Sequence, residues 1–115
     1  MEFKDTQAIY LQIVDWMCDN IVKEKWGSDE RIPSVRELGV LLEVNPNTVM
    51  RAYECLQNQN IIYNKRGVGF FVSEDASLRV AERKRTEFID RMKLLDIPLE
   101  VILAEFEKLN RKKDS

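Results

Sequence analysis

The sequence predicts an α+β fold that is mostly helical, and three observations support this. Two helix-start signals follow one another closely, in residues 32–38 and 44–49. A stretch rich in β-forming residues comes next, at 61–72. Two amphipathic segments then occupy residues 76–111. We therefore expect an N-terminal domain of helices with a β-hairpin, followed by a short tail of two helices.

The first helix is predicted to run from about residue 6 or 7 to residue 25. Tyr10 should pack against its neighbours in this helix, and apolar residues at helical spacing should face inward, namely Ile9, Ile13, Trp16, Met17 and Ile21. Residues 27–30 then predict a turn. Since the residue before a proline favours extended backbone, Arg31 and Ile32 should form a short extended piece that pairs with the hairpin.

Two short helices should follow, joined by a tight turn. Ser34 and Glu37 have the spacing of a capping box, while Asn45 is a good N-cap with Pro46 at the first helical position. Apolar residues expected to be buried are Val35, Leu38, Leu41 and Leu42 in the first helix, and Val49, Ala52, Tyr53 and Leu56 in the second. This arrangement is a helix-turn-helix, and it leaves a polar face on the second helix that includes Asn47, Thr48 and Arg51.

The β-forming stretch predicts a hairpin with a basic tip. Strands at 61–65 and 69–72 flank a tip that contains Lys65, Arg66 and Gly67. Of Phe70 and Phe71, which alternate across the strand, one should be buried. A helix, a helix-turn-helix and a hairpin in this order make a winged helix-turn-helix. In that fold the second short helix enters the DNA major groove and the hairpin tip reaches the backbone or minor groove.

The C-terminal segments, 76–95 and 98–111, predict an antiparallel pair of helices, with Asp96 as cap of the second. Two helices alone cannot bury both of their apolar stripes, so we expect a second copy to cover them. The residues predicted to form this dimer contact are Phe88, Met92, Leu95, Leu99, Ile102, Leu103 and Phe106. The predicted domains are residues 1–75, for DNA binding, and residues 76–115, for dimerisation.

Length and composition exclude several classes of function. With 115 residues the chain has no room for a second full ligand-binding domain. It lacks an apolar segment of about 20 residues and a signal peptide, so a cytoplasmic protein is expected. It has no histidine, and Cys18 and Cys55 are isolated, which predicts reduced structural thiols without a metal or cofactor. Few groups could act as a general base, so an enzyme is not expected.

The net charge of −2 argues superficially against nucleic acid, because phosphate neutralisation by Lys and Arg provides much of the affinity for DNA. The positions of the basic residues matter more than the net charge of the chain. Arg36, Arg51, Lys65 and Arg66 all lie on elements predicted to touch DNA, whereas many acidic residues lie in the first helix and in the turn at 28–30. A positive DNA-binding face on an acidic body is therefore expected.

The motifs resemble those of the GntR transcription regulators, and within them the small YtrA-like subfamily. The resemblance rests on Ile9-Tyr10-Leu11-Gln12-Ile13, Ile32-Pro33-Ser34-Val35-Arg36-Glu37-Leu38, Asn45-Pro46-Asn47-Thr48-Val49 and Arg66-Gly67-Val68-Gly69-Phe70-Phe71-Val72. The tail also has the length and helical pattern of that subfamily. Two departures are Glu43 and Asp29, which stand where members often have glycine. A positive φ at Glu43 would introduce strain on the order of 1 kcal/mol.

The resemblance implies a homodimeric regulator, most simply a repressor, that binds a pseudo-palindromic operator in double-stranded DNA. The DNA-binding residues expected from motif and resemblance together are Ser34, Arg36, Asn45, Asn47, Thr48, Arg51, Lys65, Arg66 and Gly67. Any small-molecule effector would bind between the winged domain and the tail, or at the dimer seam.

Simpler interpretations remain open at this point. Arg36 could be a solvated arginine, Arg51 could pair with Glu54 or Glu43 within the helical region, and the hairpin tip could be an ordinary charged turn. The alternative function is a protein-interaction module that uses a winged-helix scaffold.

Overall fold

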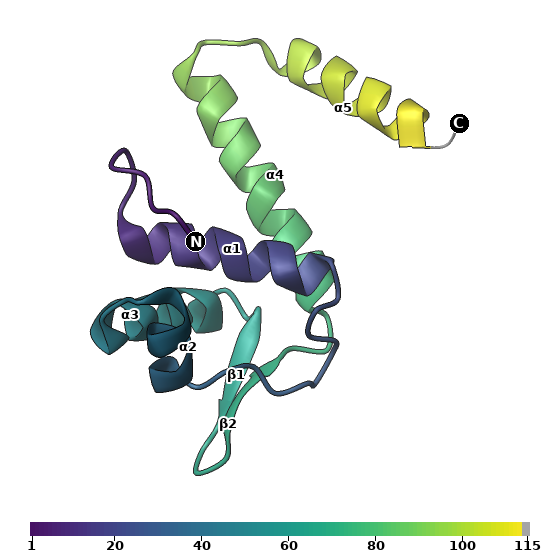
Figure 1. The fold of residues 1–115 in the computed structure, drawn as a ribbon. Helices are drawn as coiled ribbons and strands as arrows, with labels where there is room; N and C mark the ends of the chain where they lie inside the picture. The colour runs from purple at the N-terminus through teal and green to yellow at the C-terminus, as the bar shows by residue number, and fades with distance from the viewer. Residues whose placement is uncertain (114–115) are drawn as a thin grey trace. The chain divides into compact units, whose positions relative to one another are not determined.

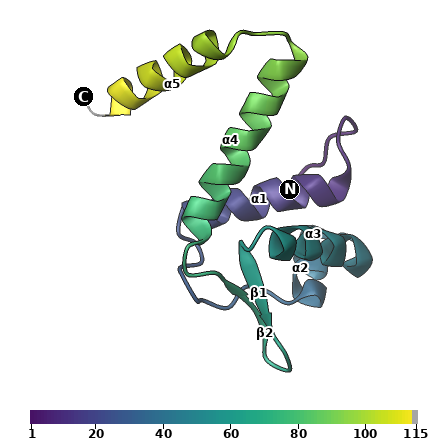
Figure 2. The ribbon, with the colours of Figure 1, turned by 180° about the vertical axis from the view of Figure 1, so that it is seen from behind.

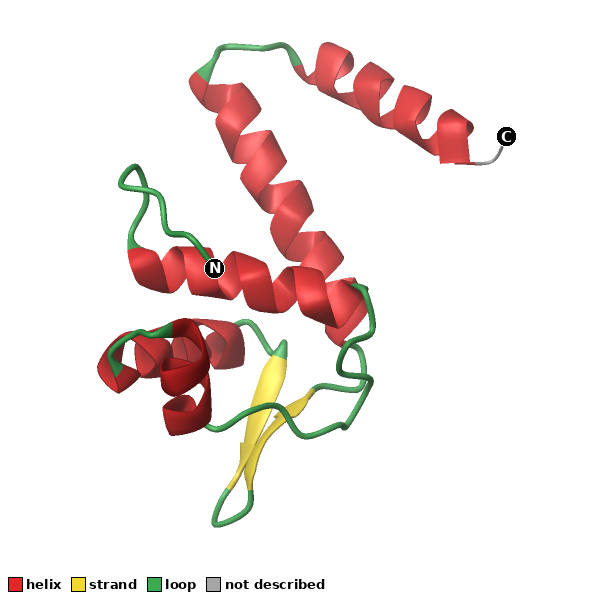
Figure 3. Ribbon diagram, in the orientation of Figure 1, coloured by secondary structure: helices red, strands yellow, loops and turns green. Residues whose placement is uncertain are grey.

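A computed structural model describes residues 1–113, with the side chains of residues 1–109. The elements are α1 (Ile9–Val22), α2 (Val35–Leu42), α3 (Pro46–Asn58), β1 (Ile62–Lys65), β2 (Gly69–Val72), α4 (Ala76–Leu94) and α5 (Leu99–Lys113) (Figures 1 and 3). The chain forms two compact units that divide within α4, between Val80 and Ala81. The predicted mostly helical fold with a two-stranded wing is confirmed.

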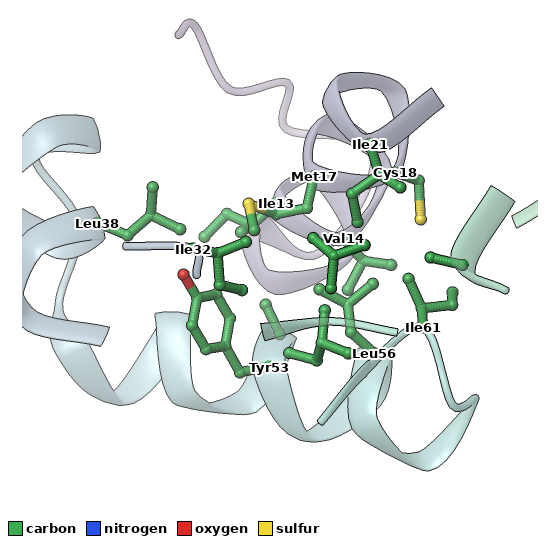
Figure 4. Packing of buried hydrophobic residues seen from close by; sticks show 14 of the residues in the cluster. Ile13, Val14, Met17, Cys18, Ile21, Ile32, Leu38, Tyr53, Leu56 and Ile61 are labelled. Atoms are coloured by element: carbon green, nitrogen blue, oxygen red, sulfur yellow. The ribbon is translucent and has the colours of Figure 1, made fainter. Parts of the chain in front are cut away.

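The core of the first unit lies between α1 and α3, and α1 lies above α3 in both views (Figures 1 and 2). Figure 4 shows the side chains of these helices directed toward one another. Tyr53 is fully buried, and Ala76 and Val80 show that the start of α4 belongs to the same core. The predicted stripes of α1 and α3 are confirmed for Ile13, Met17, Ile21, Val49, Ala52, Tyr53 and Leu56.

Helix α1 is shorter than predicted at both ends, and Ile9, its first residue, is exposed instead of facing inward. The late start of the helix follows from the side-chain amide of Gln12, which is almost fully buried. Its Oε1 accepts from the Lys4 N–H at 2.8 Å, and its Nε2 donates to the carbonyls of Lys4 and Gln7 at 2.7 and 2.8 Å. These bonds hold the chain before α1 in a turn, so the helix cannot extend further toward the N-terminus.

The turn between α2 and α3 depends on Gly39 and Glu43. A Cβ on Gly39 would lie 2.9 Å from the Val44 carbonyl oxygen, so only glycine permits this close approach. Glu43 has φ 56°, as the missing glycine suggested. Leu41 is exposed, contrary to prediction, because the short α2 directs Leu38 and Leu42, one turn apart, into the core and leaves Leu41 outside that face.

Four helices end in the same way, with a residue other than glycine in the left-handed conformation. Glu24, Glu43, Asn60 and Asp96 have φ between 53° and 59°, and the next residue donates its N–H back into the helix in each case. The Asp96 prediction was wrong: this residue ends α4, where the Ile97 N–H donates to the Met92 carbonyl at 3.1 Å, and so its backbone serves as a C-cap.

The wing is an antiparallel hairpin in which Ile62 pairs with Val72 and Lys65 with Gly69. The extended piece before α2 pairs with β2 through an isolated bridge between Arg31 and Phe71, and the Ile32 N–H donates to the Phe70 carbonyl at 3.0 Å. This pairing confirms the prediction for Arg31 and Ile32. It also fixes the base of the wing to the start of α2.

In the second unit, the Phe88 and Phe106 rings meet edge to face, with centroids 4.9 Å apart. The two residues lie at similar distances from the connection between α4 and α5, so this ring contact joins the two helices. Leu95, Leu99 and Leu103 are exposed, whereas Ile102 is buried within the single chain. Within residues 1–113, no helix combines the length and apolar character needed to cross a membrane.

Candidate nucleic-acid interface

The first turn of α3 lies on the surface, held by a local cap. The Asn45 Oδ1 accepts from the Asn47 N–H at 2.8 Å, and Pro46 occupies the first turn, where its lack of an N–H removes nothing. Asn45, Pro46 and Asn47 are exposed and Thr48 is half-buried. The cap therefore presents short polar side chains and the helix N-terminus to solvent, the arrangement that favours an anion such as phosphate.

Ser34 and Arg36 belong to α2, which precedes this turn. Ser34 forms the predicted capping box: its Oγ accepts from the Glu37 N–H, and its own N–H donates to the Glu37 carboxylate, both at 3.1 Å. The Ser34 N–H and then its hydroxyl hold the pKa of Glu37 below its usual value. Arg36, in the first turn of α2, is exposed and borders a hollow formed with Val44 and Pro46.

Arg51 extends the outward face of α3 one turn beyond Asn47. Its guanidinium lies over the Tyr10 ring, with 4.0 Å between the guanidinium carbon and the ring centroid. The alternative pairing with Glu54 or Glu43 is therefore wrong, because the side chain is directed toward α1. Tyr10 is half-buried against the core. Sequence analysis favoured a packing role for Tyr10 over a place in a ligand site, since spacing along the chain does not show that α1 and α3 meet here.

The wing carries Lys65, Arg66 and Gly67 on its exposed tip. Gly67 has φ 78°, which explains the glycine at this place. Phe70 packs against the core, whereas Phe71 stacks on Tyr63 with ring centroids 5.5 Å apart. The Lys65 Nζ lies 5.6 Å from the Phe71 ring centroid, which orients the lysine along the wing.

Arg31 is a basic residue of this surface that sequence analysis missed. It is exposed, and its side chain crosses the hairpin so closely that a Cβ on Gly69 would lie 2.9 Å from the Arg31 Nε. The sequence could have indicated this role, because Arg31 was predicted to lie in an extended piece that pairs with the wing, and such a piece places its side chains beside those of the wing. Arg31 is thus added to the basic residues of the wing, Lys65 and Arg66.

The electrostatics of this surface follow from its unpaired cations. In the part of the chain that the structure describes, Arg36, Arg51, Lys65 and Arg66 form no salt bridge, although Glu37, Glu43 and Glu54 lie on the same helices or at their ends. An ion pair would have to break before a cation could bind phosphate. The four side chains therefore keep their charge available on an acidic chain.

Comparison with known proteins identifies the family of this chain. The sequence profile described as "Bacterial regulatory proteins, gntR family" matches residues 9–72, from the start of α1 to the end of the wing. The chain belongs to the gntR family. Its relatives are transcription regulators with a winged helix-turn-helix, and none of those compared below is described as an enzyme.

The similarity extends beyond the winged domain of this gntR family member. The HTH-type transcriptional repressor YtrA of Bacillus subtilis is 36% identical over 107 residues, which cover 93% of this chain and 82% of the relative. A GntR family transcriptional regulator from Listeria monocytogenes has a solved structure with a TM-score of 0.67 and 38% identity, covering 92% of this chain and 98% of the other.

A third comparison includes nucleic acid. The AraR DNA-binding domain, solved in complex with an operator, has a TM-score of 0.58 and 26% identity, and the match covers 64% of this chain and 88% of that domain. The winged unit of this chain is therefore similar to a domain whose solved structure includes DNA.

Proposed function

We propose that this gntR family member is a homodimeric, sequence-specific repressor that occupies a pseudo-palindromic operator and blocks transcription. The observation that carries the proposal is the exposed first turn of α3, beside Arg36 and Arg51, neither of which forms a salt bridge with any side chain that the structure describes. The operator bound by the AraR domain and the printed description of YtrA as a repressor support it.

In the proposed complex, the first turn of α3 enters the major groove. Asn47 and Thr48 are short enough to approach base edges or phosphates closely, and Asn45 and Ser34 keep their caps while lying at the surface. Arg36 has the planar fork that matches either guanine or phosphate. The wing, with Lys65, Arg66 and Gly67 at its tip, would reach the minor groove or the backbone.

Dimerisation is proposed for the tail because its two helices expose several large apolar side chains. Leu95, Leu99 and Leu103 are each more than half exposed, and the half-buried side chains of Phe88, Met92 and Phe106 belong to the same pair of helices. Ile102 is buried within the single chain, so it would support this apolar surface and would not contact the second copy directly. A twofold contact here would present two copies of α3 to successive turns of one face of DNA.

The binding experiment begins by selecting the operator from random or genomic DNA and measuring affinity by fluorescence anisotropy at several salt concentrations. Arg36→Ala should weaken operator binding by about 1–3 kcal/mol and relax the base preference at one position, if the contact is bidentate to guanine. Lys23→Ala, which removes an equal charge just after α1, serves as the matched control and should change little. Absence of salt-sensitive, sequence-dependent binding would eliminate the proposal and favour the protein-interaction module.

The dimer is tested separately by sedimentation. Leu103→Glu places a charge on the exposed apolar surface of the tail and should shift the protein toward monomer, with loss of affinity for the full operator but not for a half-site. Val22→Glu makes the same change at an exposed apolar position of α1 and should leave the dimer intact. Equal behaviour of the two variants would remove the tail from the dimer contact.

A further inference from the structure

The contact between Tyr10 and Arg51 joins two elements that lie far apart in the sequence. Tyr10 belongs to the first turn of α1, and Arg51 to the outward face of α3. The 4.0 Å separation between guanidinium carbon and ring centroid places the cation directly against the aromatic ring. Tyr10 is itself held against the core, so it offers the flexible arginine a fixed surface.

An arginine stacked on an aromatic ring keeps its N–H donors available, whereas an arginine in a salt bridge uses them. A guanidinium directs its five N–H groups outward in its own plane, and a ring that contacts one face does not consume these donors. The contact therefore restricts the arginine side chain while its charge and its hydrogen-bonding edge stay available. An arginine held in this way loses less conformational freedom when it binds an anion than a freely rotating one does.

The space beside this pair suits an anionic oxygen. A hollow open to solvent lies between the starts of α1 and α3, lined by Ala8, Ile9, Tyr10, Asn47, Thr48 and Arg51. Arg51 provides the positive charge, and no carboxylate is among the lining residues. The first turn of α1 also contains no acidic residue. The chemistry of the hollow thus favours a phosphate group of the DNA backbone adjacent to the bases contacted by α3.

We propose that Tyr10 is a positioning residue for DNA binding: its ring holds the Arg51 guanidinium against one backbone phosphate of each operator half-site. The inference rests on the proposed DNA-binding function. Tyr10 acts through Arg51, which makes the contact with the phosphate. The role of the ring is to orient the cation before DNA arrives.

A double-mutant cycle on operator binding tests the coupling. Arg51→Ala should weaken binding to all sequences alike and reduce the slope of log affinity against log salt by about one. Tyr10→Leu should weaken binding about two- to fivefold, the range expected for an exposed cation–π contact. Tyr10→Phe keeps the ring and should bind like the wild type. The double variant Tyr10→Leu/Arg51→Ala should bind no more weakly than Arg51→Ala alone.

Two controls separate positioning from folding. Leu11→Ala alters a half-buried side chain next to Tyr10 without removing the ring, so its effect on binding should add to that of Arg51→Ala. Thermal melting of each variant shows whether binding is measured on folded protein, and Tyr10→Phe supplies a variant that keeps the packing. Additive effects of Tyr10→Leu and Arg51→Ala, or weak binding by Tyr10→Phe, would overturn the inference.

Replacing single backbone phosphates by an uncharged analogue shows which phosphate Arg51 contacts. Methylphosphonate substituted at single operator positions should weaken wild-type binding at each phosphate that the protein contacts, and the Arg51→Ala variant should lose this sensitivity at one of these positions in each half-site. The same sensitive positions in both proteins would show that Arg51 does not bind a phosphate. Wild-type protein that binds DNA without the coupling refutes only this inference, whereas wild-type protein without sequence-dependent binding refutes the proposed function as well.

Discussion

Tyr53→Phe should destabilise the winged unit by about 1 kcal/mol, because Tyr53 joins three parts of it. Its hydroxyl donates to the Pro33 carbonyl at 2.6 Å, just before α2, and its ring meets Phe70 of the wing edge to face at 5.0 Å. Phenylalanine keeps the ring and removes only the hydrogen bond, whose net contribution is typically about 0.5–1.5 kcal/mol. Pro33 is half-buried, so water can replace part of the lost bond.

Thermal and urea unfolding followed by circular dichroism measure this change. For a domain of this size, 1 kcal/mol corresponds to a fall in melting temperature of about 4–8 °C. Tyr63→Phe is the matched control. It also loses a tyrosine hydroxyl, in this case one that donates to Asp29 at 2.9 Å on the exposed side of the wing, and its stability should change by less than about 0.5 kcal/mol.

Alkaline pH gives an independent test, because burial raises the pKa of Tyr53 well above its ordinary value. A raised pKa in the folded state means that the stabilisation is complete below about pH 10 and is lost as pH rises toward the folded pKa. The stability of the wild type should therefore fall faster than that of Tyr53→Phe above about pH 10, and the gap between them should narrow. Equal stability at neutral pH, or a gap that widens in alkali, would refute the reasoning.

Further predictions concern the helix-turn-helix. Glu43→Gly should raise the free energy of unfolding by up to about 1 kcal/mol in urea titrations, since glycine adopts the left-handed backbone without strain; no gain would show that this strain is absent. Gly39→Ala should lower the melting temperature, because its Cβ would press on the Val44 carbonyl; an unchanged temperature would mean that the turn can shift. Ser34→Ala should remove about 1 kcal/mol at neutral pH through loss of the cap. The Ser34 N–H, which the alanine variant keeps, and the Ser34 hydroxyl, which it loses, both lower the pKa of Glu37. The part of the wild-type advantage that comes from the hydroxyl acting on Glu37 should therefore be present above about pH 4.3 and decline as pH falls through the folded pKa of Glu37.

Local signals along the chain predicted most of the elements. The capping box at Ser34, the Asn45 cap followed by proline, and the glycine at the wing tip are decided by hydrogen bonds and backbone preferences within a few residues. Periodic apolar residues likewise indicated which faces of α1 and α3 are buried. Such features depend only on neighbours in sequence, so the sequence by itself determined the winged helix-turn-helix and the placement of Asn47, Lys65 and Arg66 on its surface.

Contacts between distant segments were decided only by the tertiary structure. The stacking of Arg51 on Tyr10, the passage of Arg31 across Gly69 and the Gln12 bonds that stop α1 early all join residues whose proximity depends on how elements pack. Asp96 illustrates the same limit locally, because an aspartate at a helix boundary can cap the following helix or end the preceding one. Packing energies select among such alternatives, and no pattern within one segment contains them.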